Sequence, residues 1–522
     1  MNKAIICVLL IIINSIITRS YFTLATGQPV SVDAWQLIKN AEIGIKLGHI
    51  DRSIENIDNY NINWPLSQIF GILISIIFGV EIKDAMRLGF PLIASISPLL
   101  LFTLSLKLTK NNLTAFLASL FLANYTYNIY FTSGITKETF SYPFFIFSLL
   151  CFLLIFKNKK YIIPFFISSI VLLISHHFTL AVFYIVLLFF LTCYLVYSIA
   201  YAKKINKGII ISFALFTFFI LLYYNFYVNR EVFSFLSFSD ILIFLSYQAF
   251  ILLIFVKTKI ININSKVSNK IFIIFFSFIF LYILNLFFNI FPYNYIYSTY
   301  FLISSISYII LIFFILLAYK HIKLNEYSIM KLFLLTWPAA IFAFYLYAFF
   351  GANYLLSITL SKRLLDFLFP STFLLISLYL IKNKKLTTVF SMLIILLFLT
   401  QIYFIYPLKL NYTGYQWLYS KEEIEAFNWL KEYYANNVII GDVKASYALS
   451  YFGLSVNPYD SYLYFFEDKK VKNALIVLYY EMLYNGFVLT DYGEKLKDEW
   501  KTKMYEKSII FSNYRTFIFH EL

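Results

Sequence analysis

Charged residues are scarce in this chain and make up 13% of its 522 residues, about half of the share that soluble proteins carry. Hydrophobic residues make up 61%. They form long runs with short polar interruptions, and most runs are close to the ~20 residues that a helix needs to cross a bilayer. This pattern excludes a soluble globular protein and predicts an α-helical polytopic membrane protein.

Cysteine is almost absent. Cys7, Cys151 and Cys193 all lie in apolar runs, where a thiol behaves as a small hydrophobic side chain, so no disulfide framework and no cysteine-based metal site is expected. Acidic residues are outnumbered by Lys and Arg, 27 to 42. Because the lysines lie in short loops between apolar runs, we interpret them as orientation signals and expect no nucleic-acid partner.

Hydropathy predicts about thirteen membrane helices, near 4–20, 89–106, 112–130, 139–156, 161–176, 178–200, 208–227, 241–256, 270–290, 298–319, 328–349, 364–382 and 386–406. With a cytoplasmic N-terminus and a retained first helix, the lysine clusters between spans fall inside the cell, as the positive-inside rule requires. Counting the apolar run 63–80 as a span would put the later clusters outside. We therefore expect this run to dip into the outer leaflet, with Trp64 at headgroup level.

This topology divides the chain into a transmembrane domain, residues 1–410, and a small extracytoplasmic α/β domain, residues 411–522. The first external loop, 21–88, contains an amphipathic stretch at 33–47 with Ser31 as its expected N-cap. In the C-terminal domain we expect helices at 422–434 and 498–507 and strands at 438–440, 474–480 and 508–521.

Candidate residues for chemistry fall on the external side under this topology. They are Asp33, Lys137, Glu138, His176, His177 and Arg363. Each has an ordinary structural alternative, as an acid at a helix start, a polar residue at the interface, or a basic side chain that snorkels from a helix end. Ionisable residues at membrane depth are costly and indicate function by default, and the convergence of several on one face favours the functional interpretation.

The chemical types of these residues fit one reaction. Asp33 and Glu138 would activate a hydroxyl or amide nucleophile, either directly as a base or through a bound divalent cation, Mg²⁺ or Mn²⁺. Lys137, His176, His177 and Arg363 would hold a phosphate and stabilise its charge as it leaves. A phosphate carried on a polyprenyl chain would keep its lipid in the membrane and its head at the rim.

The sequence resembles the GT-C glycosyltransferases, and in layout most closely the catalytic subunit of oligosaccharyltransferase. The resemblance lies in Val-Asp-Ala-Trp at 32–35, Pro-Leu at 65–66 before the apolar dip, and the run 130–138 that contains Ser-Gly and ends at Glu138. At these places the family has its first external aspartate, a short apolar segment and an Asp-x-Asp motif. The similarity is strongest over residues 1–200.

The resemblance implies that Asp33 is the catalytic or metal-binding carboxylate, that Glu138 is the second acid, and that Arg363 meets the donor phosphate. The second motif has one acid here, preceded by Lys137, which would take over the cation's work. The Trp-Trp-Asp-Tyr-Gly motif that reads the asparagine acceptor is absent. We infer a relative that uses a polyprenyl-phosphate sugar on another acceptor.

The favoured interpretation is an integral membrane glycosyltransferase that moves a sugar or glycan from a polyprenyl-phosphate donor to an acceptor glycan, lipid or protein, with membrane lipid as a further partner. One alternative is a polysaccharide polymerase or ligase. Another is a transporter or flippase of lipid-linked sugars, which should carry ionisable residues near mid-span and interrupted, repeated helices. The sequence analysis finds neither feature.

Overall fold

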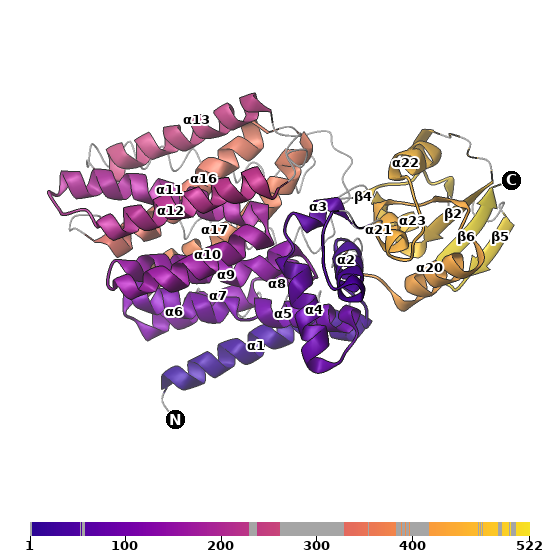
Figure 1. The fold of residues 1–522 in the computed structure, drawn as a ribbon, viewed down its shortest axis with the longest axis horizontal. Helices are drawn as coiled ribbons and strands as arrows, with labels where there is room; N and C mark the ends of the chain where they lie inside the picture. The colour runs from indigo at the N-terminus through magenta and orange to yellow at the C-terminus, as the bar shows by residue number, and fades with distance from the viewer. Residues whose placement is uncertain are drawn as a thin grey trace.

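The computed structural model describes residues 3–228 without 53 and 55–57, residues 237–260, residues 328–382 without 353, the single positions 388, 392 and 396, and residues 417–521 without 468, 470, 472, 489–492, 501 and 503–507. These residues form a helical bundle and, beside one end of it, a small α/β domain (Figure 1). We keep the name first external loop for residues 21–88, which the sequence predicts to lie outside; the helices of this segment lie between the two parts (Figure 1).

The described helices of the bundle are α1 (Lys3–Thr26), α5 (Ile82–Ala94), α6 (Ser97–Thr109), α7 (Asn112–Asn124), α8 (Thr126–Thr132), α9 (Lys137–Ile155), α10 (Ile162–Ser175), α11 (His177–Ala200), α12 (Lys207–Phe226), α13 (Phe238–Phe255), α16 (Ile329–Phe350) and α17 (Tyr354–Lys382). Within the described residues, eight helical runs are long and apolar enough to cross a membrane. The chain is therefore an integral membrane protein. The expected spans 270–290 and 298–319, and 386–406 apart from three positions, lie outside the described residues, so the total of thirteen stays a prediction.

Two expected spans are interrupted. The run 89–106 is divided between α5 and α6, because Pro98 has no N–H to continue the helical hydrogen bonds of α5. Helix α5 also begins earlier than expected, at Ile82, since Arg87 and Asp84 pair at 2.8 Å instead of marking a loop. The run 112–130 is divided between α7 and α8 at Tyr125, whose backbone is extended.

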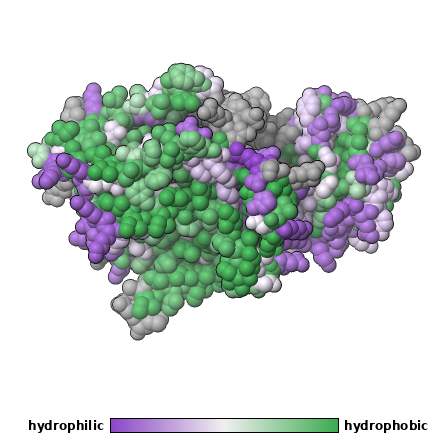
Figure 2. Space-filling model, in the orientation of Figure 1, coloured by the Kyte–Doolittle hydropathy of each residue, from purple (hydrophilic) through white to green (hydrophobic). Residues whose placement is uncertain are grey.

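On the face that Figure 2 shows, the described surface of the bundle is mostly apolar, while the C-terminal domain and the opposite end of the bundle are more hydrophilic. Helix α4 (Leu66–Phe78) exposes Ile76, Ile77 and Phe78. Its 13 residues are fewer than the ~20 that a span requires. This length agrees with the expected dip at 63–80.

The first external loop contains α2 (Ala34–Leu47) and α3 (Asn59–Ile62). Leu37, Ile38 and Ala41 form the buried face of α2, which packs against α5. The expectation that Ser31 is the N-cap is wrong, because Asp33 occupies that position. Ser31, at a φ of 90°, instead accepts a hydrogen bond from the Asp33 backbone N–H at 3.3 Å.

The C-terminal domain is the expected small α/β unit. Its four-stranded sheet has the order β1-β2-β6-β5, in which the β1–β2 pair is parallel and the other pairs are antiparallel. The strands are β1 (Val438–Ile440), β2 (Ala474–Tyr479), β5 (Ser508–Ser512) and β6 (Thr516–Glu521), with a β3 (Phe487–Val488) and β4 (Gly493–Glu494) pair; the helices are α20 (Lys421–Tyr433), α21 (Val443–Tyr451), α22 (Pro458–Glu467) and α23 (Tyr480–Asn485).

The segment 508–521 forms a hairpin instead of one strand, with the turn at Tyr514, whose φ is 70°. Most of the helix expected at 498–507, and the domain boundary at 410, lie outside the described residues.

The C-terminal domain packs on the first external loop. The ring of Trp35 in α2 contacts Tyr419 and Tyr451 at centroid distances of 5.3 and 5.2 Å. The Tyr451 hydroxyl donates to Glu42 at 2.9 Å. These contacts fix the domain beside Asp33, which immediately precedes α2.

Candidate functional site

The candidate residues lie at one end of the bundle. Lys137 and Glu138 begin α9, and His177 begins α11. Because α9 has 19 residues, its far end lies about 28 Å away. The described lysine clusters 107–110, 157–160 and 203–207 follow the ends of α6, α9 and α11. The helix directions therefore separate the candidate site from the lysine loops, which the sequence predicts for the cytoplasmic side.

Asp33 and Glu138 are far apart in sequence, but a backbone contact brings their segments together. The Ile135 N–H donates to the Val30 carbonyl at 3.0 Å. Gly134 lies so close to Ser31 that a Cβ atom on it would be 3.1 Å from the Ser31 Cβ, so glycine permits this approach. The Thr136 side chain then caps α9 through the Thr139 N–H at 2.9 Å.

Glu138 faces Arg363. The Arg363 Nε lies 3.9 Å from the Glu138 Oε2, and the side chains are 26% and 3% exposed. The carboxylate is thus buried, while the guanidinium extends from it toward solvent. A guanidinium can bind a phosphate through a bidentate pair of N–H donors.

Lys137 is 8% exposed, and its ammonium lies over two aromatic rings, 4.0 Å from the Tyr60 centroid and 4.8 Å from that of Trp64. Its Nζ makes no hydrogen bond with any described residue. Each cation–π contact contributes roughly 0.5–2 kcal/mol, whereas a buried ammonium without hydrogen bonds costs several kcal/mol. Asp33 and Asp58 are near enough to act on it electrostatically. An anion bound beside the Lys137 ammonium would offset this cost.

The two histidines have different partners. His176 caps α11, and its Nδ1 accepts from the Thr179 backbone N–H at 3.4 Å. In the neutral ring the proton then lies on Nε2, which can donate. The His177 ring packs against Trp64 with centroids 4.5 Å apart. The aromatic pair Tyr60 and Trp64 therefore connects His177 to Lys137.

The sequence analysis missed Asp58, Tyr60 and Trp64 as site residues. Asp58 caps α3 by accepting from the Tyr60 N–H at 2.9 Å. Burial raises the pKa of the Tyr60 hydroxyl to about 12; Arg363 lowers this pKa, while Asp33 and Asp58 raise it further. The hydroxyl therefore stays protonated at neutral pH and can donate to an anion. The only sequence signal was a polar and aromatic segment directly before the apolar dip.

A second polar cluster lies inside the bundle. Arg19 of α1 donates to Asn128 Oδ1 at 2.6 Å and to Thr132 at 2.9 Å, and the Asn128 amide donates to Asp366 of α17 at 3.1 Å. Arg19 is 0% and Asp366 1% exposed. The sequence analysis overlooked these charges within spans. Asp366 was detectable, because it lies three residues after Arg363 and therefore on nearly the same helix face.

The carboxylates allow one limited kind of metal site. Within the described residues, no three His, Cys, Asp or Glu side chains come together as possible ligands. Mg²⁺ is commonly held by one or two carboxylates with substrate phosphate and water, so Asp33 and Glu138 would fit such an ion only together with the donor phosphate. Arg363 already places positive charge beside Glu138.

Comparisons with known proteins give little further information. No family model matches the chain, and no curated protein matches it. Two crystal structures of ArnT from Cupriavidus metallidurans match 99% of this chain with a TM-score of 0.41. The structure bound to undecaprenyl phosphate has 8% sequence identity to this chain, and the match covers 98% of the ArnT chain. The apo structure has 10% sequence identity, and the match covers 97% of the ArnT chain. A TM-score this low does not establish a common fold.

Proposed function

We propose that this protein is a GT-C-type glycosyltransferase that transfers a sugar or glycan from a polyprenyl-phosphate donor to an acceptor on the extracytoplasmic face. The observation that carries the proposal is the buried Lys137 ammonium, which makes no hydrogen bond with the described residues and lies near enough to Arg363 to interact with it electrostatically. Such an arrangement is costly without an anion and stable with one. A phosphate at a membrane rim is the anion that fits.

The reaction assigns a role to each residue. Asp33 takes the proton from the acceptor nucleophile, whose oxygen or nitrogen then bonds to the anomeric carbon of the sugar. The bond from that carbon to the phosphate oxygen breaks, and the polyprenyl phosphate leaves with the electron pair. Lys137 and Arg363 stabilise the negative charge that develops. Glu138 orients Arg363, and His176 and His177 hold the phosphate in place.

The cation requirement is a separate part of the proposal. We assign the charge stabilisation to Lys137 and Arg363, and Mg²⁺ or Mn²⁺ bound by Asp33 and Glu138 is the alternative. Chelation with EDTA separates the two, because Lys137 and Arg363 would sustain transfer without a divalent ion. Loss of transfer on chelation and its recovery with Mg²⁺ or Mn²⁺ would favour the metal.

The direct test measures transfer of radiolabelled sugar from a polyprenyl-phosphate donor in reconstituted membranes. Asp33→Asn should lower the rate by on the order of 10²–10⁴, as loss of a catalytic base does, and leave donor binding nearly intact. Arg363→Ala should mainly weaken donor binding. Turnover by Asp33→Asn near that of the unmodified protein would refute the assigned base.

A transport function has one observation in its favour. Arg19 and Asp366 are buried inside membrane helices, where ionisable residues often mark ion or substrate pathways. Proteoliposomes that translocate a fluorescent polyprenyl-phosphate sugar without transferring the sugar would support transport. Sugar transfer without translocation would support the glycosyltransferase.

A further inference from the structure

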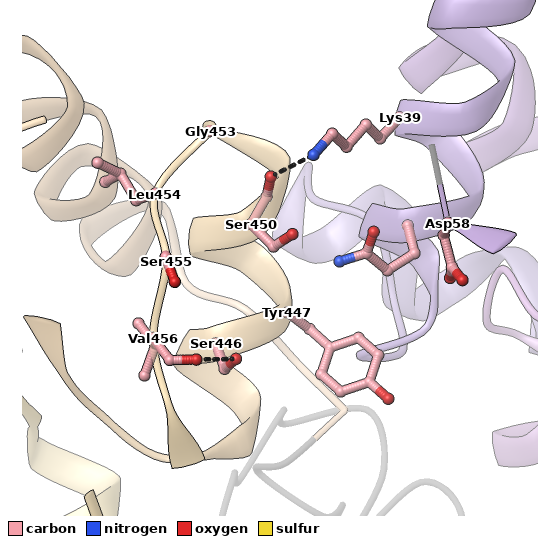
Figure 3. Close-up of a pocket in the computed structure, with 10 residues that line it drawn as sticks. Lys39, Asp58, Ser446, Tyr447, Ser450, Gly453, Leu454, Ser455 and Val456 are labelled. Atoms are coloured by element: carbon pink, nitrogen blue, oxygen red, sulfur yellow. Dashed lines mark hydrogen bonds between the residues drawn. The ribbon is translucent and has the colours of Figure 1, made fainter. Parts of the chain in front are cut away.

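A polar cavity of about 720 Å³ lies between the first external loop and the C-terminal domain. Figure 3 shows Lys39 and Asp58 on one side of it and Ser446, Tyr447 and Ser450 of α21 on the other. This volume is within the roughly 300–1,000 Å³ that small-ligand sites occupy. Both walls consist of described residues.

The face of α21 that lines the cavity is polar, because the apolar residues of this helix lie on the opposite face and pack in the domain core. Ala445, Ala448 and Leu449 are buried in the domain core. Ser446 and Ser450 are four residues apart and so lie on one side of the helix, where they and Tyr447 line the cavity. The following loop adds Ser455. The wall therefore presents several hydroxyl groups, which both donate and accept hydrogen bonds.

The opposite wall supplies Gln36, Lys39 and Asp58. The Lys39 Nζ donates to the Ser450 carbonyl at 3.0 Å, which fixes the separation of the two walls near that point (Figure 3). The single cation and the single carboxylate in the lining balance each other. The cavity therefore suits a neutral polar molecule with many hydroxyl groups better than it suits a lipid chain or a phosphate.

The cavity adjoins the candidate catalytic residues. Asp33 occupies the N-cap position of α2, and Gln36 follows three residues later on nearly the same face, about 4.5 Å along the helix axis. Asp58 also belongs to both places, since it lines the cavity and caps the helix that holds Tyr60 over Lys137. A molecule that contacts Gln36 in the cavity would therefore lie about one helical turn from Asp33.

We propose that this cavity binds the carbohydrate portion of the acceptor, so that the acceptor is a glycan rather than a peptide. The inference rests on the proposed function, because only a transferase needs an acceptor site beside Asp33. It also gives the C-terminal domain a specific role: the domain supplies the hydroxyl-rich wall, and the first external loop supplies the amide and charged groups.

The test uses full-length protein in detergent and an array of defined oligosaccharides and peptides. The unmodified protein should bind oligosaccharides. Gln36→Ala on one wall and Tyr447→Ala on the other should each weaken that binding at least about tenfold. Tyr459→Ala is the matched control, because Tyr459 is 69% exposed on α22 and does not line the cavity. The midpoint of thermal unfolding of each variant checks that it folds.

A second readout separates this inference from the proposed function. Asp33→Asn should still bind oligosaccharides but lose transfer, whereas Tyr447→Ala should raise the acceptor KM and retain donor binding. Oligosaccharide binding without any transfer from a polyprenyl-phosphate donor would reject the proposed function alone. Binding of peptides only, no oligosaccharide binding, or an unchanged acceptor KM in both folded cavity variants would overturn the glycan site.

Discussion

Lys137 is the residue at which sequence and structure differ most in what they reveal. Its sequence position beside Glu138 predicts a cation at an external helix start. Its sequence neighbours give no indication of the rings of Tyr60 and Trp64, which approach it only after the first external loop folds onto the bundle. The residue types of the site and the side of the membrane on which they lie can thus be predicted from the sequence. The aromatic rings that surround Lys137 cannot, because tertiary contacts bring them there.

Replacement of Lys137 by Met separates function from stability. Met fills a similar volume without the buried charge, so Lys137→Met should unfold at an equal or higher temperature. The same change removes the ammonium that is proposed to bind the phosphate, and it should weaken polyprenyl-phosphate binding by at least about tenfold. Thermal unfolding and a binding titration in detergent measure the two effects. A variant that binds the lipid phosphate normally would contradict the proposed role of Lys137.

The Arg19–Asn128–Asp366 cluster predicts non-additive stability. Arg19→Leu leaves Asp366 buried opposite Asn128 without its compensating charge, and loss of one buried partner typically costs about 3–5 kcal/mol. The double variant Arg19→Leu/Asp366→Leu removes both charges and should recover much of that loss. The free energies of unfolding of the two single variants, the double variant and the unmodified protein together form a double-mutant cycle. Strictly additive losses would show that the two charges do not interact.

At the scale of helices and strands, local pattern was sufficient where one face is apolar. The predicted stretch 33–47 corresponds to α2, the predicted strand 438–440 is β1, and 422–434 is α20 shifted by one residue. The pattern was insufficient where hydropathy is uniform. The runs 89–106 and 112–130 looked continuous, although Pro98 and the extended Tyr125 interrupt them. Proline alone would not have located these breaks, because Pro143 and Pro338 lie inside α9 and α16 without ending them.

The stability of the C-terminal domain should depend on pH because of one carboxyl group, that of Asp442. Burial raises the pKa of Asp442 to about 6, against the effect of its hydrogen bonds from Tyr479, Ala445 and Val488, while the unfolded carboxyl has a pKa of about 3.9. Between about pH 4 and pH 6 the folded domain binds a proton that the unfolded chain releases. Stability therefore falls as the pH rises through this window, by on the order of 3 kcal/mol in total.

Hydrogen exchange in full-length protein measures this effect through the protection of β2, which pairs directly with β6. Asp442→Asn should be less stable at every pH, because an amide N–H₂ replaces an oxygen that accepts from the Val488 N–H. In this variant the protection of β2, corrected for the intrinsic exchange rate, should not decrease between pH 4 and pH 6. The same fall in the variant would assign the pH dependence to another group.

At the scale of the whole molecule, the helix directions put the candidate site at one end and the described lysine clusters at the other. The apolar surface of the bundle lies between the two ends (Figure 2). Hydropathy and the positive-inside rule were enough to predict this separation, because both depend on composition along the chain. Neither hydropathy nor the positive-inside rule could predict how the C-terminal domain packs against α2, because Trp35 contacts Tyr419 and Tyr451 only in the folded protein.

Cysteine labelling of intact cells tests which end faces outward. Tyr514 is 95% exposed in the C-terminal domain, and Lys204 is exposed in the loop after α11. In a Cys7→Ser background, with Cys151 and Cys193 buried, an impermeant maleimide should label Tyr514→Cys directly. It should label Lys204→Cys only after permeabilisation, because the lysine loops are expected inside. The reverse pattern would place the Lys137 site in the cytoplasm and reject an extracytoplasmic acceptor, and labelling of both positions from one side would contradict the separation of the two ends.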